Sequence, residues 1–498
     1  MNSLKSLKNI VSKLTEEEIK TLKKVLSINI VLKNESKSLN LINLLLSDKN
    51  YSFNEIQNNI YGKPNYNAFN KLLNRTKHKV LETIILDVTI SSNNFSKRNK
   101  VNLDLRKKLL QADILQLKGI RKEVLPIYNY IISHSKYFEL FDIQVSALVS
   151  KQRLQLINSK VNSFVKINDE IEYAESCHKA LKTSSKIYND IINKINNSIN
   201  QSSYIDELKS LIVKLNEYYN IYRLPTIGFY LFTLEAEICE NNLFYDKSKD
   251  ALEKAKNILL LNESAYTENR YGTVLLNLSN CYIYLLKFDQ AINLALESKR
   301  YFKNLPLTLK IVDEILFYAY FYKLDYVNCS KILSNNNYIK YDDDNLKNKF
   351  YYFQSCLFFI NKKNIESLEA LSNCSELKND NEGWNINMRI LLILNRIELN
   401  DYDSIDLKIQ NLEKYIKRIS NNKSSIQRQV LILRILTKLI QEDFNFKKVY
   451  TKRLKYFNIL ESKTGIYRWQ IKSPELIIFN NWFKFKMNGS EKNDSLSN

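Results

Sequence analysis

Histidine and cysteine are the residues of this 498-residue chain that could most directly do chemistry. The three histidines, His78, His134 and His178, lie far apart, and none has the H-x-x-x-H or H-E-x-x-H spacing that presents two zinc ligands on one helix face. Cys177 and His178 are adjacent, but neighbouring side chains on a helix diverge by about 100°. This adjacency therefore does not make a nucleophile and its base.

Other reactive motifs are also missing from the sequence. The six cysteines form no C-x-x-C pair, and the seven glycines never cluster into a phosphate-binding loop. Neither G-x-S-x-G nor a kinase motif set is present. The run Asp342–Asp344 could hold a hard cation, or it could be a solvated turn that caps the following helix. We therefore expect a protein that is not an enzyme and uses no cofactor or metal.

The composition suggests two explanations for a strong positive charge. The formal net charge is +21, which is typical of nucleic-acid binding. Lys, Asn, Ile and Tyr all have A/T-rich codons, however, so codon usage alone could produce it. The excess of positive charge is concentrated at one end, because residues 1–130 carry 23 Lys and Arg against 11 Asp and Glu, a net of +12.

Several cysteines lie in apolar helical runs, as is usual in proteins of a reducing compartment. With no signal peptide and no membrane span evident, we expect a cytoplasmic protein without a membrane partner.

The pattern of apolar residues predicts helices almost throughout. Apolar positions recur at i, i+3, i+4 and i+7, and seven Gly with five Pro are too few for the turns of an all-β domain. A longer period of about 38 residues, within the range of helical repeats, connects Ala291 to Cys329, Ser367 and Ile405. Aromatic residues and apolar residues recur with the same offset on either side, at Tyr282, Tyr320 and Phe358 and at Leu333, Leu371 and Ile409.

This period is typical of a repeated pair of helices. A small residue near the start of the second helix lets the two helices approach, and larger residues fill the space to the next pair. One pair cannot bury its apolar face alone, so neighbouring pairs must stack.

The run Leu278-Ser279-Asn280-Cys281-Tyr282, followed by Phe288-Asp289-Gln290-Ala291, resembles the tetratricopeptide repeat family in its small, aromatic and alanine positions. The family's helix-A glycine is replaced here by Ser279 or Phe317, and the period is longer than the family's usual length of about 34 residues. The resemblance implies an all-α fold, an α-solenoid of helix pairs that winds into a right-handed superhelix. It also implies that the first helix of each pair lines a concave groove.

Carrying that geometry over to this sequence gives the candidate partner-binding residues. Tyr and Asn side chains offer flat apolar area with hydrogen-bonding tips, which suits an extended peptide or a helix. The alternative is that many of them pack between repeats. The candidates are Tyr230, Asn280, Tyr284, Tyr318, Tyr322, Tyr352 and Phe359.

The N-terminal hundred residues carry their own signals. Thr15 with Glu18, and Ser52 with Glu55, are capping boxes that open helices. A turn at 61–65 then precedes a basic helix over about 66–86. This arrangement could be a DNA-reading helix-turn-helix that uses Lys71, Arg75, Lys77 and Lys79, or a helical cap whose basic residues are solvated.

The sequence thus predicts five regions: a basic N-terminal helical domain (1–100), irregular repeats with long helices (101–222), tetratricopeptide-like repeats (223–460), a C-terminal capping helix (461–487) and a disordered tail (488–498). For function, we expect a non-catalytic scaffold or adaptor that binds a protein or peptide partner in its groove. The alternative is a nucleic-acid-binding regulator in which the repeats sense a partner, for instance in a bacterial stress or defence system.

Overall fold

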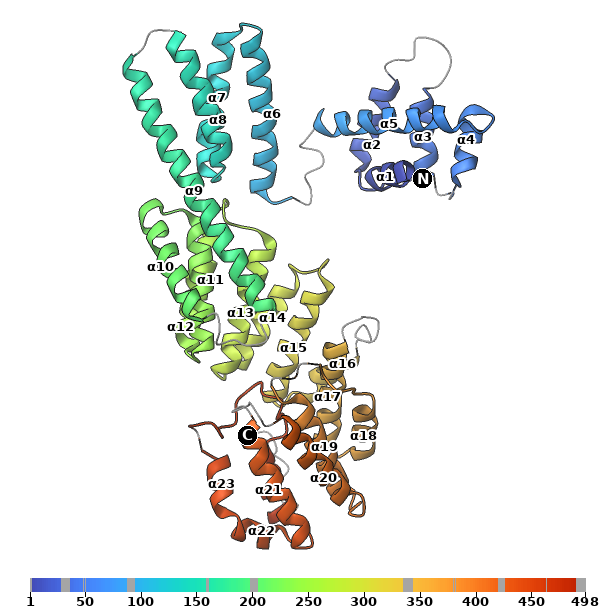
Figure 1. The fold of residues 1–498 in the computed structure, drawn as a ribbon, viewed down its shortest axis with the longest axis vertical. Coiled ribbons are helices and arrows are strands. Elements are labelled where there is room, and N and C mark those ends of the chain that lie inside the picture. The colour runs from blue at the N-terminus through green and yellow to red at the C-terminus, as the bar shows by residue number, and fades with distance from the viewer. Residues whose placement is uncertain are drawn as a thin grey trace. The chain divides into compact units, whose positions relative to one another are not determined.

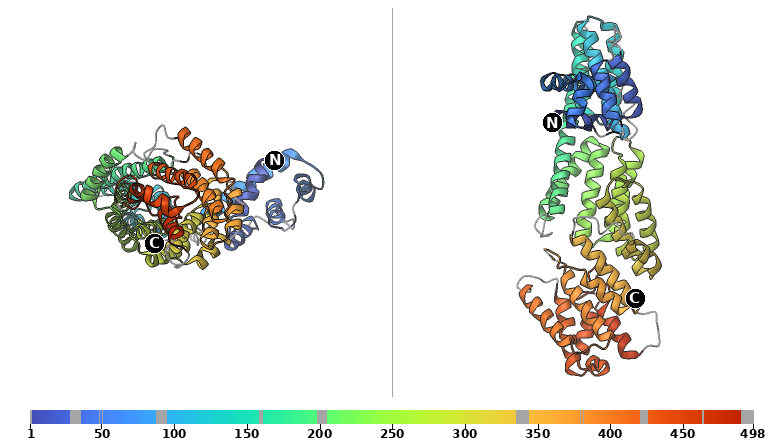
Figure 2. Two further views of the ribbon diagram at one scale, coloured as in Figure 1. Left: turned by 90° about the horizontal axis from the view of Figure 1, so that it is seen from below. Right: turned by 90° about the vertical axis from the view of Figure 1, so that its right-hand side faces the viewer.

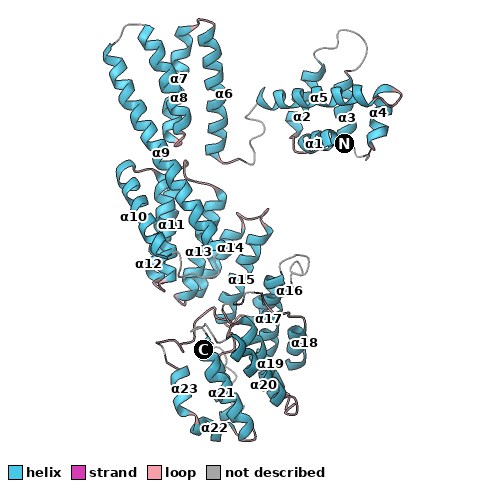
Figure 3. Cartoon of the chain, viewed as in Figure 1, coloured by secondary structure: helices cyan, strands magenta, loops and turns pink. Residues whose placement is uncertain are grey.

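The computed structural model of the chain describes residues 2–27, 36–47, 49, 51–86, 95–157, 161–197, 205–334, 344–378, 380, 382–419, 426–462 and 464–489. Within these ranges the structure consists of helices and their connections and contains no strand (Figure 3). Asp342, Asp343 and residues 490–498 lie outside them, and Asp344 begins a helix. The chain forms two compact units, which we describe separately. Unit 1 comprises 1–187, 215–230 and 258–268, and unit 2 comprises 188–214, 231–257 and 269–498.

The helices that precede residue 223 are labelled in Figure 1. They are α1 (Asn2–Val11), α2 (Glu16–Ser27), α3 (Lys37–Leu46), α4 (Phe53–Tyr61), α5 (Tyr66–Leu86), α6 (Lys97–Leu117), α7 (Arg121–Tyr137), α8 (Phe141–Ile157), α9 (Val161–Asn197) and α10 (Ile205–Tyr222).

The first five helices share a core of their own. Helix α5 contacts α1, α2 and α3, and its buried Phe69, Leu72 and Val80 pack with apolar residues of those helices. Both predicted capping boxes are confirmed. At the start of α4 the Glu55 N–H donates to Ser52 Oγ while the Ser52 N–H donates to the Glu55 carboxylate. The predicted helix over about 66–86 is confirmed as α5.

Helices α6, α7 and α8 contact one another. Gly119 adopts a left-handed conformation (φ 78°) at the α6–α7 turn, where a residue with a Cβ would be strained. Tyr128 of α7 is fully buried, and its hydroxyl lies within hydrogen-bonding distance of Asp113 and Gln116 of α6. The sequence predicts long helices within 101–222, and α9 is one of them.

The later helices are α11 (Pro225–Asn241), α12 (Tyr245–Leu261), α13 (Glu268–Tyr284), α14 (Phe288–Lys299), α15 (Pro306–Tyr322), α16 (Tyr326–Ser334), α17 (Asp344–Ile360), α18 (Asn364–Ser372), α19 (Trp384–Glu398), α20 (Ile405–Ile419), α21 (Gln427–Gln441), α22 (Phe446–Lys452), α23 (Leu454–Leu460) and α24 (Phe479–Asn488).

The repeat period of the sequence is visible in these helices. The first helices α13, α15 and α17 begin at residues 268, 306 and 344, and the second helices α14, α16 and α18 begin at 288, 326 and 364. Consecutive helices from α14 to α21 each contact the next, and the succession can be followed in Figure 2. Unit 2 is therefore built from sequential helix pairs in a solenoid-like arrangement.

The small residues that mark the period make close contacts within each pair. Ser279 Oγ donates to the Ala291 carbonyl (2.7 Å), and Ser367 Oγ donates to the Ser355 carbonyl (2.9 Å). Cys329 is fully buried, with its sulfur 3.8 Å from the Phe317 carbonyl oxygen. A small side chain at this position lets the second helix approach the backbone of the first, as the pattern predicts.

The turns within the pairs also repeat, and they do so without glycine. Leu286, Leu324, Lys362 and Asn400 have φ values between 55° and 65°, and each lies two residues after the end of a first helix. The N–H of the next residue bonds back into the last turn, for example from Lys287 to the Tyr282 carbonyl (2.8 Å). This is the bonding of a Schellman motif, which caps the end of a helix.

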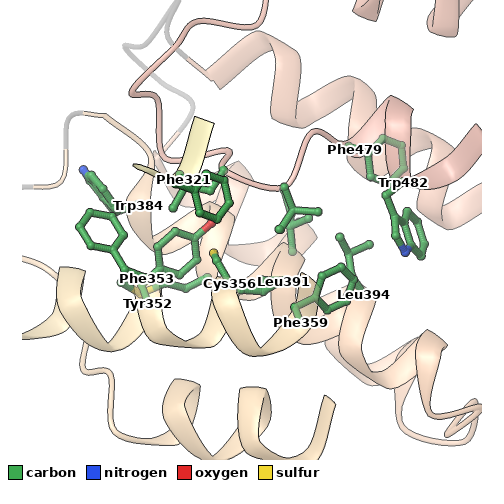
Figure 4. Close-up of a cluster of buried hydrophobic side chains, with 14 of the residues drawn as sticks. Phe321, Tyr352, Phe353, Cys356, Phe359, Trp384, Leu391, Leu394, Phe479 and Trp482 are labelled. Atoms are coloured by element: carbon green, nitrogen blue, oxygen red, sulfur yellow. The ribbon is translucent and has the colours of Figure 1, made fainter. Parts of the chain in front are cut away.

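The sequence-based helix at 461–487 is wrong in its first half. Helix α24 begins only at Phe479, and residues 464–478, which we call the C-terminal strap, are not helical. The reason is local: Gly465 has φ 84°, Lys472 has φ 62°, and Pro474 cannot donate an N–H. Helix α24 nevertheless closes the core, because Phe479, Trp482 and Phe483 are buried in the same cluster as α15–α21. Phe479 and Trp482 are labelled in Figure 4.

Candidate functional site

The C-terminal strap lies against the first helices of three consecutive pairs. The Lys472 N–H donates to Tyr322 Oη of α15 (3.0 Å), and Tyr352 Oη of α17 donates to the Pro474 carbonyl (2.6 Å). The ring of Trp469 meets that of Tyr322 edge-on, at 5.9 Å between centroids. Two tyrosine hydroxyls therefore hold main-chain groups of a non-helical segment that is distant in the sequence.

The side chain of Lys472 is held by the same face. Its Nζ donates to Asn280 Oδ1 of α13 (2.5 Å) and lies 5.7 Å from the ring centroid of Tyr284 and 5.5 Å from that of Tyr318. Ring faces attract cations at such distances. Burial lowers the pKa of Lys472, despite the opposing attraction of Glu314 and other carboxylates. Aromatic rings, an amide oxygen and nearby carboxylates thus surround one ammonium group.

A buried ion pair anchors the far end of the strap. The guanidinium of Arg428 in α21 donates to both carboxylate oxygens of Glu475, at 2.6 and 2.9 Å, and the two side chains are 6% and 4% exposed. Arg428 also donates to the carbonyls of Leu460 and Tyr467, and Glu475 accepts the Phe479 N–H at the start of α24. Such pairing is what makes a buried charge tolerable.

A cavity of about 620 Å³ lies between the strap and these helices. This volume falls within the range of about 300–1,000 Å³ that is usual for sites that bind small ligands. Five glutamates line it, and four of them, Glu237, Glu240, Glu314 and Glu382, lie outside the pair with Arg428. Its other charged lining residues are Lys349, Arg468, Lys472 and the closed pair of Arg428 with Glu475. Lys349 is 3.6 Å from Glu314, so these two are paired.

Glu237 and Glu240 lie one turn apart at the end of α11. Burial raises the pKa of Glu240, which accepts hydrogen bonds from Ser248, Cys281 and Asn280. Burial also raises the pKa of Glu237. The negative charge of Glu237 further raises the pKa of Glu240. The positive charges nearby therefore do not offset the desolvation of these two carboxyl groups.

Part of the cavity lining is aromatic. The rings of Tyr245, at the start of α12, and Tyr284 are stacked, with centroids 4.0 Å apart and planes within 3°. Trp384, at the start of α19, donates from Nε1 to Glu382 (2.7 Å) and lies edge-on to Tyr352. Flat rings beside carboxylates are a combination suited to organic cations.

Two polar atoms of the lining have no hydrogen-bond partner within the part of the chain that the structure describes. They are Gln429 Oε1 on α21 and Ser473 Oγ on the strap. Gln429 is only 6% exposed. A buried acceptor without a donor costs about 1–3 kcal/mol, so a donor in the cavity would relieve that cost.

The sequence-predicted partner residues divide into three groups. The structure brings five of them together around the strap and its cavity: Asn280, Tyr284, Tyr318, Tyr322 and Tyr352. Phe359 is 5% exposed and points into the core toward Leu394 (Figure 4). Tyr230 belongs to unit 1 and is 6% exposed.

The predicted nucleic-acid residues all lie on α5, but not on one face. Lys71 and Arg75 are exposed and Lys79 is half-buried, and they follow each other every four residues. At about 100° per residue they occupy a stripe about 80° wide. Lys77 lies elsewhere on the helix and donates from Nζ to Ser6 Oγ of α1 (3.0 Å).

Neither the histidines nor Cys177 are among the residues that line the cavity. His78 contacts Glu82 (3.2 Å), and His134 stacks on Tyr130 at 3.9 Å. Cys177 is fully buried, and burial raises the pKa of its thiol. Among the described residues there is no group of three or more His, Cys, Asp or Glu that could hold a metal ion.

Sequence reasoning missed the strap and the acidic lining. Gly465, Ser473 and Pro474 are breakers that could have excluded a helix over 464–478. The carboxylates come from α11, α15 and the residues before α19, so no local spacing connects these three segments.

No known family model matches the chain, and no curated protein matches it either. Within the described ranges, none of the helices combines the length and the apolar character needed to cross a membrane.

Proposed function

We propose that unit 2 is a non-catalytic, tetratricopeptide-like module that binds an extended peptide of a protein partner. The observation that carries this proposal is the strap itself. Two tyrosines of the first helices bond to its main chain, through the Lys472 N–H and the Pro474 carbonyl. Contacts of this kind recognise an extended backbone whatever its sequence. The cavity beside the strap leaves space for a second segment.

The regular repeat period and the small residues within each pair support the resemblance to tetratricopeptide repeats. The first helices of the pairs supply the tyrosines, which is the face that this resemblance implies for partner binding. The buried or half-buried free cysteines are in keeping with a reducing compartment. A cytoplasmic location and a role as scaffold or adaptor remain predictions.

A peptide selection tests the proposal. Phage that display random heptapeptides are selected on the immobilised full-length protein, and enrichment is measured by sequencing. We expect enriched peptides whose recovery falls at least fivefold with Tyr245→Ala, which removes one ring of the stacked pair at the cavity. The matched control is Tyr402→Ala, because Tyr402 stacks on Phe444 at 4.0 Å and does not line the cavity. No enrichment, or equal loss in both variants, would refute the proposal.

A second candidate function is nucleic-acid binding by the N-terminal helices. The observation that favours it is the basic stripe of Lys71, Arg75 and Lys79 on α5. Phosphate contacts make affinity for duplex DNA fall steeply with salt. We expect Lys71→Glu with Lys79→Glu to abolish binding in the full chain. Lys20→Glu with Lys24→Glu, two exposed lysines of α2, makes the same change in net charge and should retain most of it. Binding that is absent or independent of salt would exclude this function.

A further inference from the structure

The cavity in unit 2 has more negative than positive charge. Once the pairs Arg428 with Glu475 and Lys349 with Glu314 are set aside, its lining holds Glu237, Glu240 and Glu382 against Lys472 and Arg468. Arg468 and Glu382 are both exposed, so water screens both of their charges, and the half-buried groups that remain are Glu237 and Glu240 against Lys472. This local excess of carboxylates occurs in a chain whose net charge is +21. The cavity is therefore a place where a cation gains attraction despite the repulsion of the whole chain.

The excess carboxylates gather around the aromatic part of the lining. Glu240 accepts hydrogen bonds from Asn280 and Cys281, which lie one turn before Tyr284 on α13, and Glu382 lines the same cavity as this ring. Burial raises the pKa of Tyr284, and the charges of Glu240 and Glu382 raise it further. Tyr284 stacks on Tyr245, and Tyr245 in turn feels the charge of Glu240. Ring faces and carboxylates therefore meet in one region, which is the chemistry that holds an alkylammonium group.

The unpartnered lining atoms indicate what else the ligand must supply. Gln429 Oε1 is an acceptor, is more than nine-tenths buried, and lacks a donor among the described residues. Ser473 Oγ can accept as well. A ligand with several N–H donors would satisfy these atoms, whereas an anion would leave Gln429 unbonded and would add repulsion from the glutamates.

Lys472 shows how this part of the lining holds such a group. Its ammonium lies over Tyr284 and Tyr318 and donates to Asn280, while its main-chain N–H donates to Tyr322. The strap thus presents a lysine on a non-helical backbone, and both the side chain and the main chain are recognised.

We infer that the cavity binds a lysine side chain of an extended partner peptide, with its ammonium between Glu237, Glu240 and Glu382 and against the stacked rings of Tyr245 and Tyr284. This inference rests on the proposed peptide-binding function and names the chemistry of the peptide. Main-chain N–H groups of the same peptide are the donors for Gln429 and Ser473.

Calorimetric titration of the full-length protein tests the inference. The probes are acetylated and amidated pentapeptides Ala-Ala-X-Ala-Ala in which X is lysine, norleucine or glutamate, together with n-butylamine. We expect the lysine peptide to bind at least tenfold more tightly than the norleucine peptide, which has a stem of similar length without the charge. The glutamate peptide should not bind. Butylamine, which has the ammonium without a peptide backbone, should bind much more weakly than the lysine peptide.

Matched variants locate the binding. Glu237→Gln with Glu382→Gln keeps the shape of the side chains and removes two charges from the cavity, so affinity for the lysine peptide should fall at least tenfold. Glu366→Gln with Glu369→Gln makes the same change in charge on the exposed face of α18, and should leave affinity within twofold. Thermal melting verifies that both variants are folded.

The other possible results would each overturn one part of the inference. Equal affinity for the lysine and norleucine peptides, or equal losses in the two double variants, would overturn the inference. Butylamine binding as tightly as the lysine peptide would overturn the peptide as the source of the amine. If the phage selection enriches peptides but no alanine-based probe binds, the lysine inference fails and the proposed function stands. If the selection also fails, both fail.

Discussion

Arg428 and Glu475 are the residues on which the C-terminal strap depends. They are 47 positions apart, and both are almost completely buried. The guanidinium also donates to two carbonyls and to Asn480 Oδ1, so most of its donors are used. Removing one partner of such a pair leaves an uncompensated buried charge, which costs more than the pair itself contributes.

We therefore expect Arg428→Met to lower the free energy of unfolding by about 3–5 kcal/mol, because Glu475 then lacks its counter-ion. The double variant with Glu475→Leu should recover a large part of this loss. Lys417→Met, which removes one partner of the exposed pair with Glu413, serves as the control and should cost less than about 1 kcal/mol. Chemical denaturation of the four proteins gives these values. A double variant no better than the single one would contradict the explanation.

Glu442 gives a prediction for the dependence of stability on pH. Lys438, Lys448 and Lys452 lie 2.6–2.8 Å from its carboxylate and hold its pKa far below the ordinary 4.5. A carboxyl group whose pKa is lowered by folding stabilises the protein above its unfolded pKa, and this contribution is lost as pH falls toward the folded pKa.

Melting temperatures should therefore differ most between the wild type and Glu442→Gln near pH 7, and the difference should shrink below about pH 4.5. The control is Glu413→Gln, because Glu413 forms an exposed i, i+4 pair with Lys417. The melting temperature of Glu413→Gln should differ little from that of the wild type at every pH. A Glu442→Gln difference that grows toward acid would be inconsistent with the lowered pKa.

At the scale of the elements, the left-handed turns within the helix pairs carry a strain that glycine would remove. Leu286 has φ 59° and is 65% exposed, so replacing it with glycine loses little apolar burial. The left-handed conformation costs a residue with a Cβ about 1–2 kcal/mol, and a glycine at this position avoids that cost. Part of the resulting gain in stability is offset, because glycine has greater conformational freedom in the unfolded chain.

Leu286→Gly should accordingly raise the free energy of unfolding by about 0.5 kcal/mol, as measured by urea denaturation. Lys287→Gly tests whether the effect belongs to the turn, because Lys287 has φ −102° and no such strain. It should not increase stability. An increase in both variants would point to a cause other than the left-handed conformation.

The helices were largely predictable because their signals are local. The capping boxes at Thr15 and Ser52 and the repeat period with small residues at 291, 329 and 367 all correspond to features of the structure. The turns were not predictable in detail, because Leu286 and Leu324 adopt a conformation that a sequence normally signals with glycine.

The candidate site was predictable only on its tyrosine side. Tyr284, Tyr318 and Tyr322 follow from the helix period, since they lie on the first helix of a pair. Glu240 and Gln429 line the same cavity because segments that are distant in the sequence fold together. No regular spacing in the sequence indicates that these two residues are neighbours.

At the scale of the whole molecule, the described residues form several separate apolar clusters. Helices α1–α5 bury Leu7, Leu22, Leu41 and Phe69 in a cluster of their own, and α5 contacts each of the other four helices.

A fragment of residues 1–86 should therefore fold alone, with helical circular dichroism and one cooperative thermal transition. A fragment of residues 1–65 lacks α5 and should show no cooperative transition, because Phe69, Leu72 and Val80 are missing from the core. Non-cooperative melting of the longer fragment would mean that this cluster needs the rest of the chain.

The long sequence separations within the strap contacts have a consequence for synthesis. Asn280, Tyr322 and Tyr352 precede their strap partners by 192, 150 and 122 residues. They leave the ribosome well before Trp469, Lys472 and Pro474 are translated. During that interval the tyrosine-lined face of the nascent chain is uncovered and accessible to chaperones and competing segments. The face is covered only after Lys472 has been synthesised and the strap can bind.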